Sequence, residues 1–134
     1  MPGKFVTRET VLHQSVPNCE LGWHSSPSFT SCKNVVVVEA VFVEGKSHAF
    51  HRHPNQEEVI YVLEGRIEQW LEKEKSVLGP GESLFIPANV IHATYNVFPA
   101  PAKILAILSP PSGESGIETI DMFEQAPWNS LRKK

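Results

Sequence analysis

The sequence has 134 residues, the length of a single domain. Hydrophobic residues make up 41% and charged residues 20%, a composition that is typical of folded globular proteins and excludes a disordered chain. The formal net charge is -3 and the longest basic run is 132–134, so the charge pattern argues against a nucleic-acid-binding protein.

The sequence shows no signal for membrane insertion or secretion. No unbroken apolar run approaches the ~20 residues that a membrane-spanning helix needs. The first residues do not combine an apolar stretch with a small-residue cleavage site. We therefore expect a cytoplasmic protein that contacts no membrane, in which Cys19 and Cys32 are unpaired thiols.

Eleven prolines and eight glycines interrupt the chain so often that few stretches could form a long helix. Short segments rich in β-branched and aromatic residues recur between them, which predicts an all-β fold. Their regular spacing is typical of a sandwich or barrel. The predicted strands are Phe5–Leu12, Val35–Val43, Val59–Leu63, Arg66–Glu72, Ser83–Ile86, His92–Val97 and Lys103–Leu108.

We predict one domain with three parts. Residues 1–34 supply an N-terminal strand and a loop that pack on the barrel, residues 35–110 form the barrel core, and residues 111–134 form a C-terminal tail. The polar segment 18–33 is expected to form a loop or short edge elements. After a flexible stretch at 112–116, the tail is expected to pack as a short turn or helix.

Alternation along the segment 58–63 divides its side chains between two faces, and the face with Glu58 is expected to point inward. The opposite face, which includes Tyr61, is also apolar, although a strand of a small barrel should have one polar face. Trp70 has the outward parity on the next predicted strand. These apolar side chains need a further cover, so we predict a homodimer.

His51 and His53 are two residues apart, so on a strand their imidazoles project from the same face and can reach one ion. A carboxylate follows after a short turn, and inward alternation selects Glu58 rather than Glu57 as the third ligand. His92, which follows a second glycine and proline turn, is the fourth candidate.

Three other polar residues are interpreted from their position. Gln69 points inward among apolar neighbours, either as a hydrogen-bonded core amide or as a ligand contact. Asn96 shares the inward parity of His92 and is expected to tie down a loop. His48 is expected at the mouth of the barrel or on the surface.

These residues and spacings resemble the two motifs of the cupin superfamily. The first motif, Gly-x5-His-x-His-x3–4-Glu-x6-Gly, is matched by Gly45, His51, His53, Glu58 and Gly65. The second motif, Gly-x5-Pro-x-Gly-x2-His-x3-Asn, is matched by Gly81, Pro87, His92 and Asn96. Asn89 replaces the glycine of the second motif, and asparagine tolerates a left-handed turn, so the turn can survive.

The resemblance implies a double-stranded β-helix, the jelly-roll barrel of the cupins, with a metal held inside by three histidines and Glu58. Three imidazoles and one carboxylate suit a divalent transition metal, Fe, Mn, Ni, Cu or Zn, rather than Mg or Ca. Such an ion keeps open positions for water, dioxygen or a substrate. The residues expected to line the pocket are Gln69, Ile60, Val62, Phe85 and Ile104.

The first hypothesis for function is a metal-dependent dioxygenase-like oxidoreductase that acts on a small organic molecule, with Glu58 also serving as a catalytic base. The alternative is a non-catalytic protein that uses the metal to bind a carboxylate or a sugar. A sugar isomerase or epimerase ranks third, because nothing in the sequence marks the His and Tyr acid-base pair of metal-free epimerases.

Overall fold

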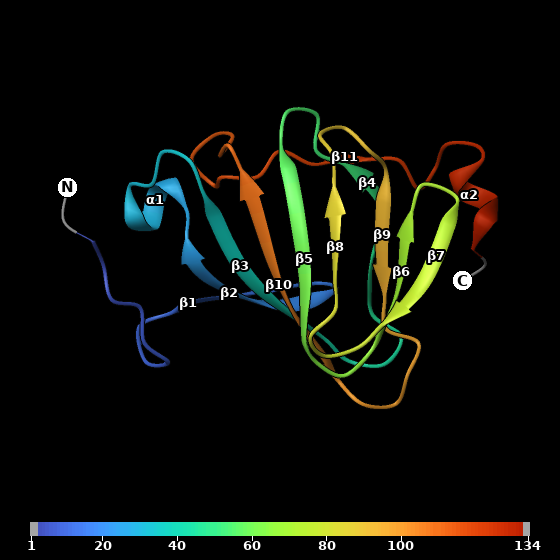
Figure 1. The fold of residues 1–134 in the computed structure, drawn as a ribbon, viewed down its shortest axis with the longest axis horizontal. Helices are drawn as coiled ribbons and strands as arrows, with labels where there is room; N and C mark the ends of the chain where they lie inside the picture. The colour runs from blue at the N-terminus through green and yellow to red at the C-terminus, as the bar shows by residue number, and fades with distance from the viewer. Residues whose placement is uncertain (1–2, 133–134) are drawn as a thin grey trace.

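The computed structural model describes residues 3–132, which form two antiparallel β-sheets (Figure 1). In order, the six-stranded sheet contains β1 (Leu12–Val16), β2 (Cys19–Ser25), β3 (Val36–Phe42), β10 (Ala102–Ser109), β5 (Glu57–Glu64) and β8 (Ser83–Ile86). The five-stranded sheet contains β11 (Ile120–Asp121), β4 (Ser47–Arg52), β9 (His92–Tyr95), β6 (Ile67–Leu71) and β7 (Glu74–Leu78). This architecture confirms the predicted double-stranded β-helix.

The described residues contain two short helices, α1 (Pro27–Thr30) and α2 (Trp128–Leu131). Neither is long or apolar enough to span a membrane.

The predicted strands of the barrel core agree with the structure to within about two residues, whereas those near the N-terminus do not. The prediction for 5–12 is wrong: Phe5 is 96% exposed, and the Thr7 carbonyl accepts hydrogen bonds from the amides of Thr10 and Val11, which turns the chain. The segment 18–33 contains β2, a seven-residue strand that pairs with both β1 and β3. Strands β4, β7 and β11 were not among the predicted strands either.

The alternation predicted for β5 is confirmed. Glu58, Ile60 and Val62 are buried, with exposed fractions of 6%, 3% and 0%, and Tyr61 and Leu63 are exposed on the other face. The inward-facing apolar residues of both sheets form the main core, which contains Ala40, Phe42, Ile60, Val62, Ile67, Ile86, Ala102 and Ile104.

The outer face of the five-stranded sheet carries a second apolar cluster. Phe50 lies 5.4 Å from both Trp70 and Trp128, measured between ring centroids. Trp128 belongs to α2, so the C-terminal segment of the same chain covers this face. The expectation that a second subunit covers Trp70 is therefore corrected. Trp70 and Tyr61 lie on different sheets, a fact that strand parity alone does not reveal.

An ion pair holds the end of this segment in place. The Arg132 Nε atom lies 2.7 Å from Glu68 Oε2, which also accepts a hydrogen bond of 2.7 Å from the Trp70 indole. Burial raises the pKa of Glu68, but these two donors and the positive charge of Arg132 outweigh burial and leave the pKa below its usual value. The Arg132 guanidinium also stacks over the Tyr95 ring at 4.1 Å.

Candidate metal centre

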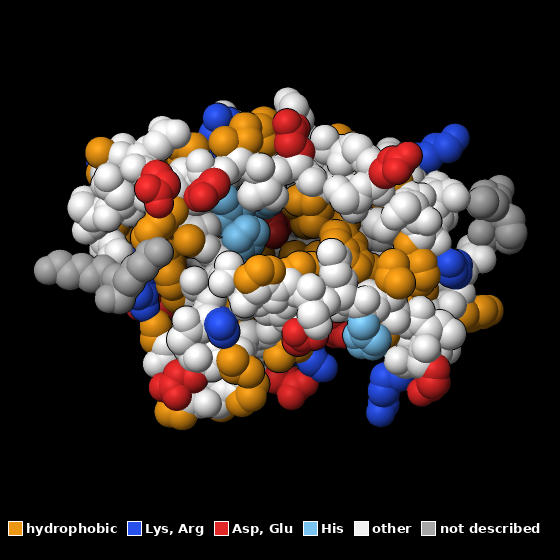
Figure 2. Space-filling model, turned by 180° about the vertical axis from the view of Figure 1, so that it is seen from behind, with side chains coloured by type: hydrophobic (Ala, Val, Ile, Leu, Met, Phe, Trp, Pro, Cys, Tyr) orange, Lys and Arg blue, Asp and Glu red, His pale blue; other side chains and the backbone are white. Residues whose placement is uncertain are grey.

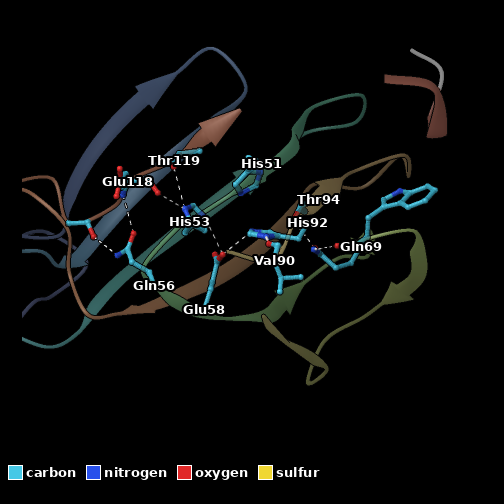
Figure 3. A network of polar contacts seen from close by, with 12 residues as sticks. His51, His53, Gln56, Glu58, Gln69, Val90, His92, Thr94, Glu118 and Thr119 are labelled. Carbon is cyan, nitrogen blue, oxygen red and sulfur yellow. Dashed lines mark hydrogen bonds and ion pairs between the residues drawn. The ribbon is translucent and has the colours of Figure 1, made fainter. Parts of the chain in front are cut away.

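Four side chains that could ligate a metal meet between the two sheets (Figure 3). His51 comes from β4, His53 from the residue just after that strand, Glu58 from β5 and His92 from β9. Their nearest ligand atoms all lie within 4.8 Å of one another. All four residues are buried, with exposed fractions between 1% and 6%. The structure therefore brings together the four residues that the sequence singled out.

Strand pairing explains how residues so far apart in sequence converge. His51 on β4 pairs directly with His92 on β9, and the register of this pair shifts between His48 and His51. Glu58 reaches the cluster from the opposite sheet because it has the inward parity on β5. The turn containing Asn89 supports His53, because the backbone amide of Asn89 donates a hydrogen bond of 2.8 Å to the backbone carbonyl of His53.

Asn89 adopts the left-handed conformation expected at this position of the motif, with a φ of 69°. Its side-chain oxygen also accepts a hydrogen bond of 2.6 Å from Arg52. Asn96 ties down a loop as expected, because its amide group donates to the carbonyls of Phe42 and Ala100 and accepts from the amide of Phe98.

Backbone carbonyls fix the orientation of all three imidazoles. The Nδ1 atoms of His51, His53 and His92 lie 2.6, 2.9 and 3.0 Å from the carbonyl oxygens of Ala49, Glu118 and Val90. A carbonyl can only accept a hydrogen bond, so each Nδ1 atom carries the hydrogen. The three Nε2 atoms are thereby left with lone pairs that face the centre of the cluster, the arrangement that a metal requires.

The cluster contains buried polar atoms that lack hydrogen-bond partners. Glu58 Oε1 lies 2.9 Å from His92 Nε2 and 3.2 Å from His53 Nε2. Neither Glu58 Oε1 nor His92 Nε2 has a hydrogen-bond partner among the described residues. Two acceptor atoms at this separation repel each other unless a cation lies between them. The four donor atoms therefore suit a divalent transition metal.

The charges of the cluster follow from its burial and its contacts. Burial alone would raise the pKa of Glu58, but the close approach of the His53 and His92 imidazoles to its Oε1 atom outweighs burial and lowers the pKa to about 2. Burial and the neighbouring imidazoles hold the pKa of His51 well below its usual value. Burial opposes protonation of His53 as well, yet Glu58 raises its pKa above the usual value. A metal ion would therefore displace a proton from this pair.

Gln56 was not identified from the sequence, and the structure gives it a supporting role. Its side chain is 1% exposed and donates to the carbonyls of Pro110 and Gly116 at 2.8 and 2.7 Å. Its side-chain oxygen accepts from the amide of Glu118 at 3.0 Å. Because the Glu118 carbonyl orients His53, Gln56 holds the segment that positions this imidazole (Figure 3). No local pattern distinguishes this glutamine from others.

A cavity of about 420 Å³ opens beside the cluster. Figure 2 shows a hollow in which histidine and acidic side chains are visible, bordered by hydrophobic side chains. His48 lines the cavity, and its ring stacks on His51 with centroids 3.5 Å apart and planes 11° apart. His48 is exposed at the mouth of the cavity, as expected. Desolvation of its ring by the surrounding protein, together with nearby His92 and His53, lowers its pKa to about 4, although Glu58 opposes this change.

Two of the five residues that were expected to line the pocket do line the cavity, and three do not. Ile60 and Ile104 line the cavity, whereas Val62 is fully buried in the main core. Phe85 is 53% exposed on the outer side of β8, because the parity of that strand turns Ile86 inward instead. Gln69 accepts a hydrogen bond of 2.6 Å from Thr94 and donates to the Trp70 carbonyl, so it is a satisfied core amide away from the cavity. The assignments of Val62, Phe85 and Gln69 to the wall are therefore corrected.

The hairpin β1–β2 also contributes to the cavity, which was not predicted from the sequence. Gln14, Asn18, Leu21 and Trp23 line the cavity from this hairpin. The alternation of Cys19, Leu21 and Trp23 with the residues between them was the available signal, because a period of two is typical of a strand.

The chain is similar to known proteins in both sequence and fold. A sequence family described as the cupin domain matches residues 38–108. An uncharacterized protein of Methanocaldococcus jannaschii is 32% identical over 85 residues, which cover 63% of this chain and 68% of that protein. Quercetin 2,3-dioxygenase of Bacillus subtilis is 30% identical over 90 residues, which cover 66% of this chain and only 26% of that enzyme.

Among solved structures, KdgF from Halomonas sp. is similar with a TM-score of 0.72 and 23% sequence identity. The similarity covers 81% of this chain and 96% of that one. It extends the agreement in fold beyond the residues matched by the sequence family.

Proposed function

The chain belongs to the cupin family, and from this membership we propose that it holds a divalent transition metal through His51, His53, Glu58 and His92. Iron, manganese, nickel, copper and zinc all suit this donor set. We propose that the protein binds a small organic molecule beside the metal and oxidises it in a dioxygenase-type reaction. The observation that carries this proposal is the convergence of three Nε2 atoms and one carboxylate beside a cavity large enough for a ligand.

The residues of the chain supply distinct parts of this activity. When bound, the metal supplies Lewis acidity and open coordination positions for oxygen-containing ligands. The carbonyls of Ala49, Glu118 and Val90 keep the imidazoles in the ligating orientation. Glu58 is ionised at neutral pH and lines the cavity, and we assign to it the role of accepting a proton from a substrate held there. The similarity to quercetin 2,3-dioxygenase supports this class of reaction.

The proposal predicts that protein purified without chelators contains close to one equivalent of transition metal per chain. The variant with both His51→Ala and His53→Ala should contain almost none, because two of the four ligand atoms are lost. Elemental analysis measures both values. Equal metal in the parent and the variant would refute the ligand assignment.

Oxygen consumption tests the reaction itself. The iron- or manganese-loaded protein should consume oxygen with a member of a panel of diketones, flavonols, thiols and enols, and the double variant should not. If the loaded protein consumes no oxygen with any of these compounds but binds one of them reversibly, the oxidoreductase proposal is wrong and the protein is a non-catalytic binding protein.

We also propose that two copies of the chain associate through the outer face of the six-stranded sheet. Tyr61 and Leu63 are each 39% exposed there, and Phe85 is 53% exposed on the neighbouring strand. Burial of this apolar surface favours association. Light scattering should give a dimer for the parent and a monomer for Tyr61→Glu, whereas a monomeric parent would exclude this interface.

A further inference from the structure

The cavity wall that the six-stranded sheet forms beside Glu58 is apolar. It is built by alternation on neighbouring strands of the six-stranded sheet, which point Val38, Ala40, Ile60, Ile104 and Ala106 into the cavity. Ala40 pairs with Ile104, and Ala106 pairs with both Val38 and Ile60. Two alanines thus occupy the middle of the wall, where larger side chains would fill the space.

Few polar side chains of the cavity are free to bind a ligand. Gln14 and Thr94 already form hydrogen bonds with other side chains of the protein. The side chains of Asn18, Ser47 and His48 line the cavity and form no hydrogen bond within residues 3–132. Asn18 and Ser47 carry no charge, so they can orient a ligand but cannot balance a charge on it.

The charged groups that line the cavity limit the charge that a bound ligand can carry. Neither lysine nor arginine lines it in the described part of the chain, and Glu58 is the one carboxylate there. The Cys19 thiol, whose pKa burial and the charge of Glu20 raise to about 11, stays neutral. A dication held by one carboxylate has a net charge of +1, which balances one negative group of a ligand. A second negative group would be buried against the apolar wall without a partner, at a large cost.

We infer, on the basis of the proposed metal site, that the ligand is a mainly apolar, ring-containing molecule that chelates the metal through a single monoanionic group, such as an enol or phenol beside a carbonyl. The cavity volume of about 420 Å³ lies within the range of small-molecule sites. Dicarboxylates and sugar acids do not fit this charge and polarity.

Matched chelators test this inference on zinc-loaded protein, because zinc adds no redox chemistry. Calorimetry would compare tropolone with 4-isopropyltropolone, which share one chelating group and differ by three apolar carbons, and with oxalate and galacturonate. Titration of free zinc with each compound corrects for its intrinsic affinity. After this correction, 4-isopropyltropolone should bind at least about tenfold more tightly than tropolone, and both should bind more tightly than the two acids.

Substitutions in the apolar wall test whether this wall causes the tighter binding of 4-isopropyltropolone. Ala106→Leu should abolish the tenfold advantage of 4-isopropyltropolone while the zinc content stays near one equivalent, because the added side chain fills the space at the middle of the wall. Ala40→Val is a milder second variant with the same expected direction, and Ala126→Leu, at an exposed alanine, is the matched control that should keep the advantage.

Equal corrected affinities for the two tropolones, or tighter binding of oxalate or galacturonate, would overturn the inference while leaving the metal site intact. Parent protein that takes up no zinc would instead overturn the proposed function and the inference together.

Discussion

Glu58→Gln is expected to lower the affinity for zinc on the order of 100-fold or more. The amide has nearly the same shape as the carboxylate, so packing is retained, but the negative charge that faces the imidazoles is lost. Glu58 Oε1 lies within 3.2 Å of the Nε2 atoms of His53 and His92, and no other carboxylate lines the cavity in residues 3–132. Competition with a chromophoric zinc chelator measures the affinity.

The adjacent carboxylate provides the control for this substitution. Glu57 is exposed and has the outward parity on β5, so Glu57→Gln should bind zinc like the parent. Circular dichroism should show that both variants are folded. If Glu58→Gln and Glu57→Gln bind zinc equally well, Glu58 is not a ligand and the proposed centre is wrong.

Gln56→Leu is expected to lower the free energy of unfolding by roughly 3 kcal/mol or more, because each buried polar group left unpaired costs about 1–3 kcal/mol. The Pro110 carbonyl and the Glu118 amide would lose their partner, and the Gly116 carbonyl would keep only the amide of Ser112. The Glu118 carbonyl orients His53, so zinc affinity should also fall, by about 10- to 100-fold. Urea denaturation and zinc titration measure the two effects.

The adjacent residue Asn55 provides a control for replacing a side-chain amide with an apolar side chain. Asn55 is exposed, and Asn55→Leu should change the unfolding free energy by no more than about 0.5 kcal/mol and leave zinc affinity unaltered. If Gln56→Leu lowers stability but leaves zinc affinity at the parent value, Gln56 supports the fold and does not position His53.

The sequence by itself was enough to predict an all-β fold and a shared face for His51, His53 and Glu58, because both depend on local periodicity. The double-stranded β-helix and the complete ligand set with His92 came from the resemblance to the cupin motifs. His51 and His53 share a face because the side chains of a strand alternate with a period of two, and the same rule separates Glu58 from Glu57. The short segments between prolines and glycines likewise indicated an all-β sandwich or barrel. These signals extend over a few residues and can be read without knowledge of what packs against them.

Only the tertiary structure decided which surfaces meet. The partners of Gln56 and His53 lie 54 to 65 residues further along the chain, and no local pattern encodes such contacts. The cover over Trp70 is a C-terminal helix of the same chain, although parity alone left a second subunit as the simplest cover. The cavity takes part of its wall from the hairpin β1–β2. Alternation along a strand predicts that a side chain points inward. The packing of distant segments determines whether that side chain contacts the core, a cavity or another strand.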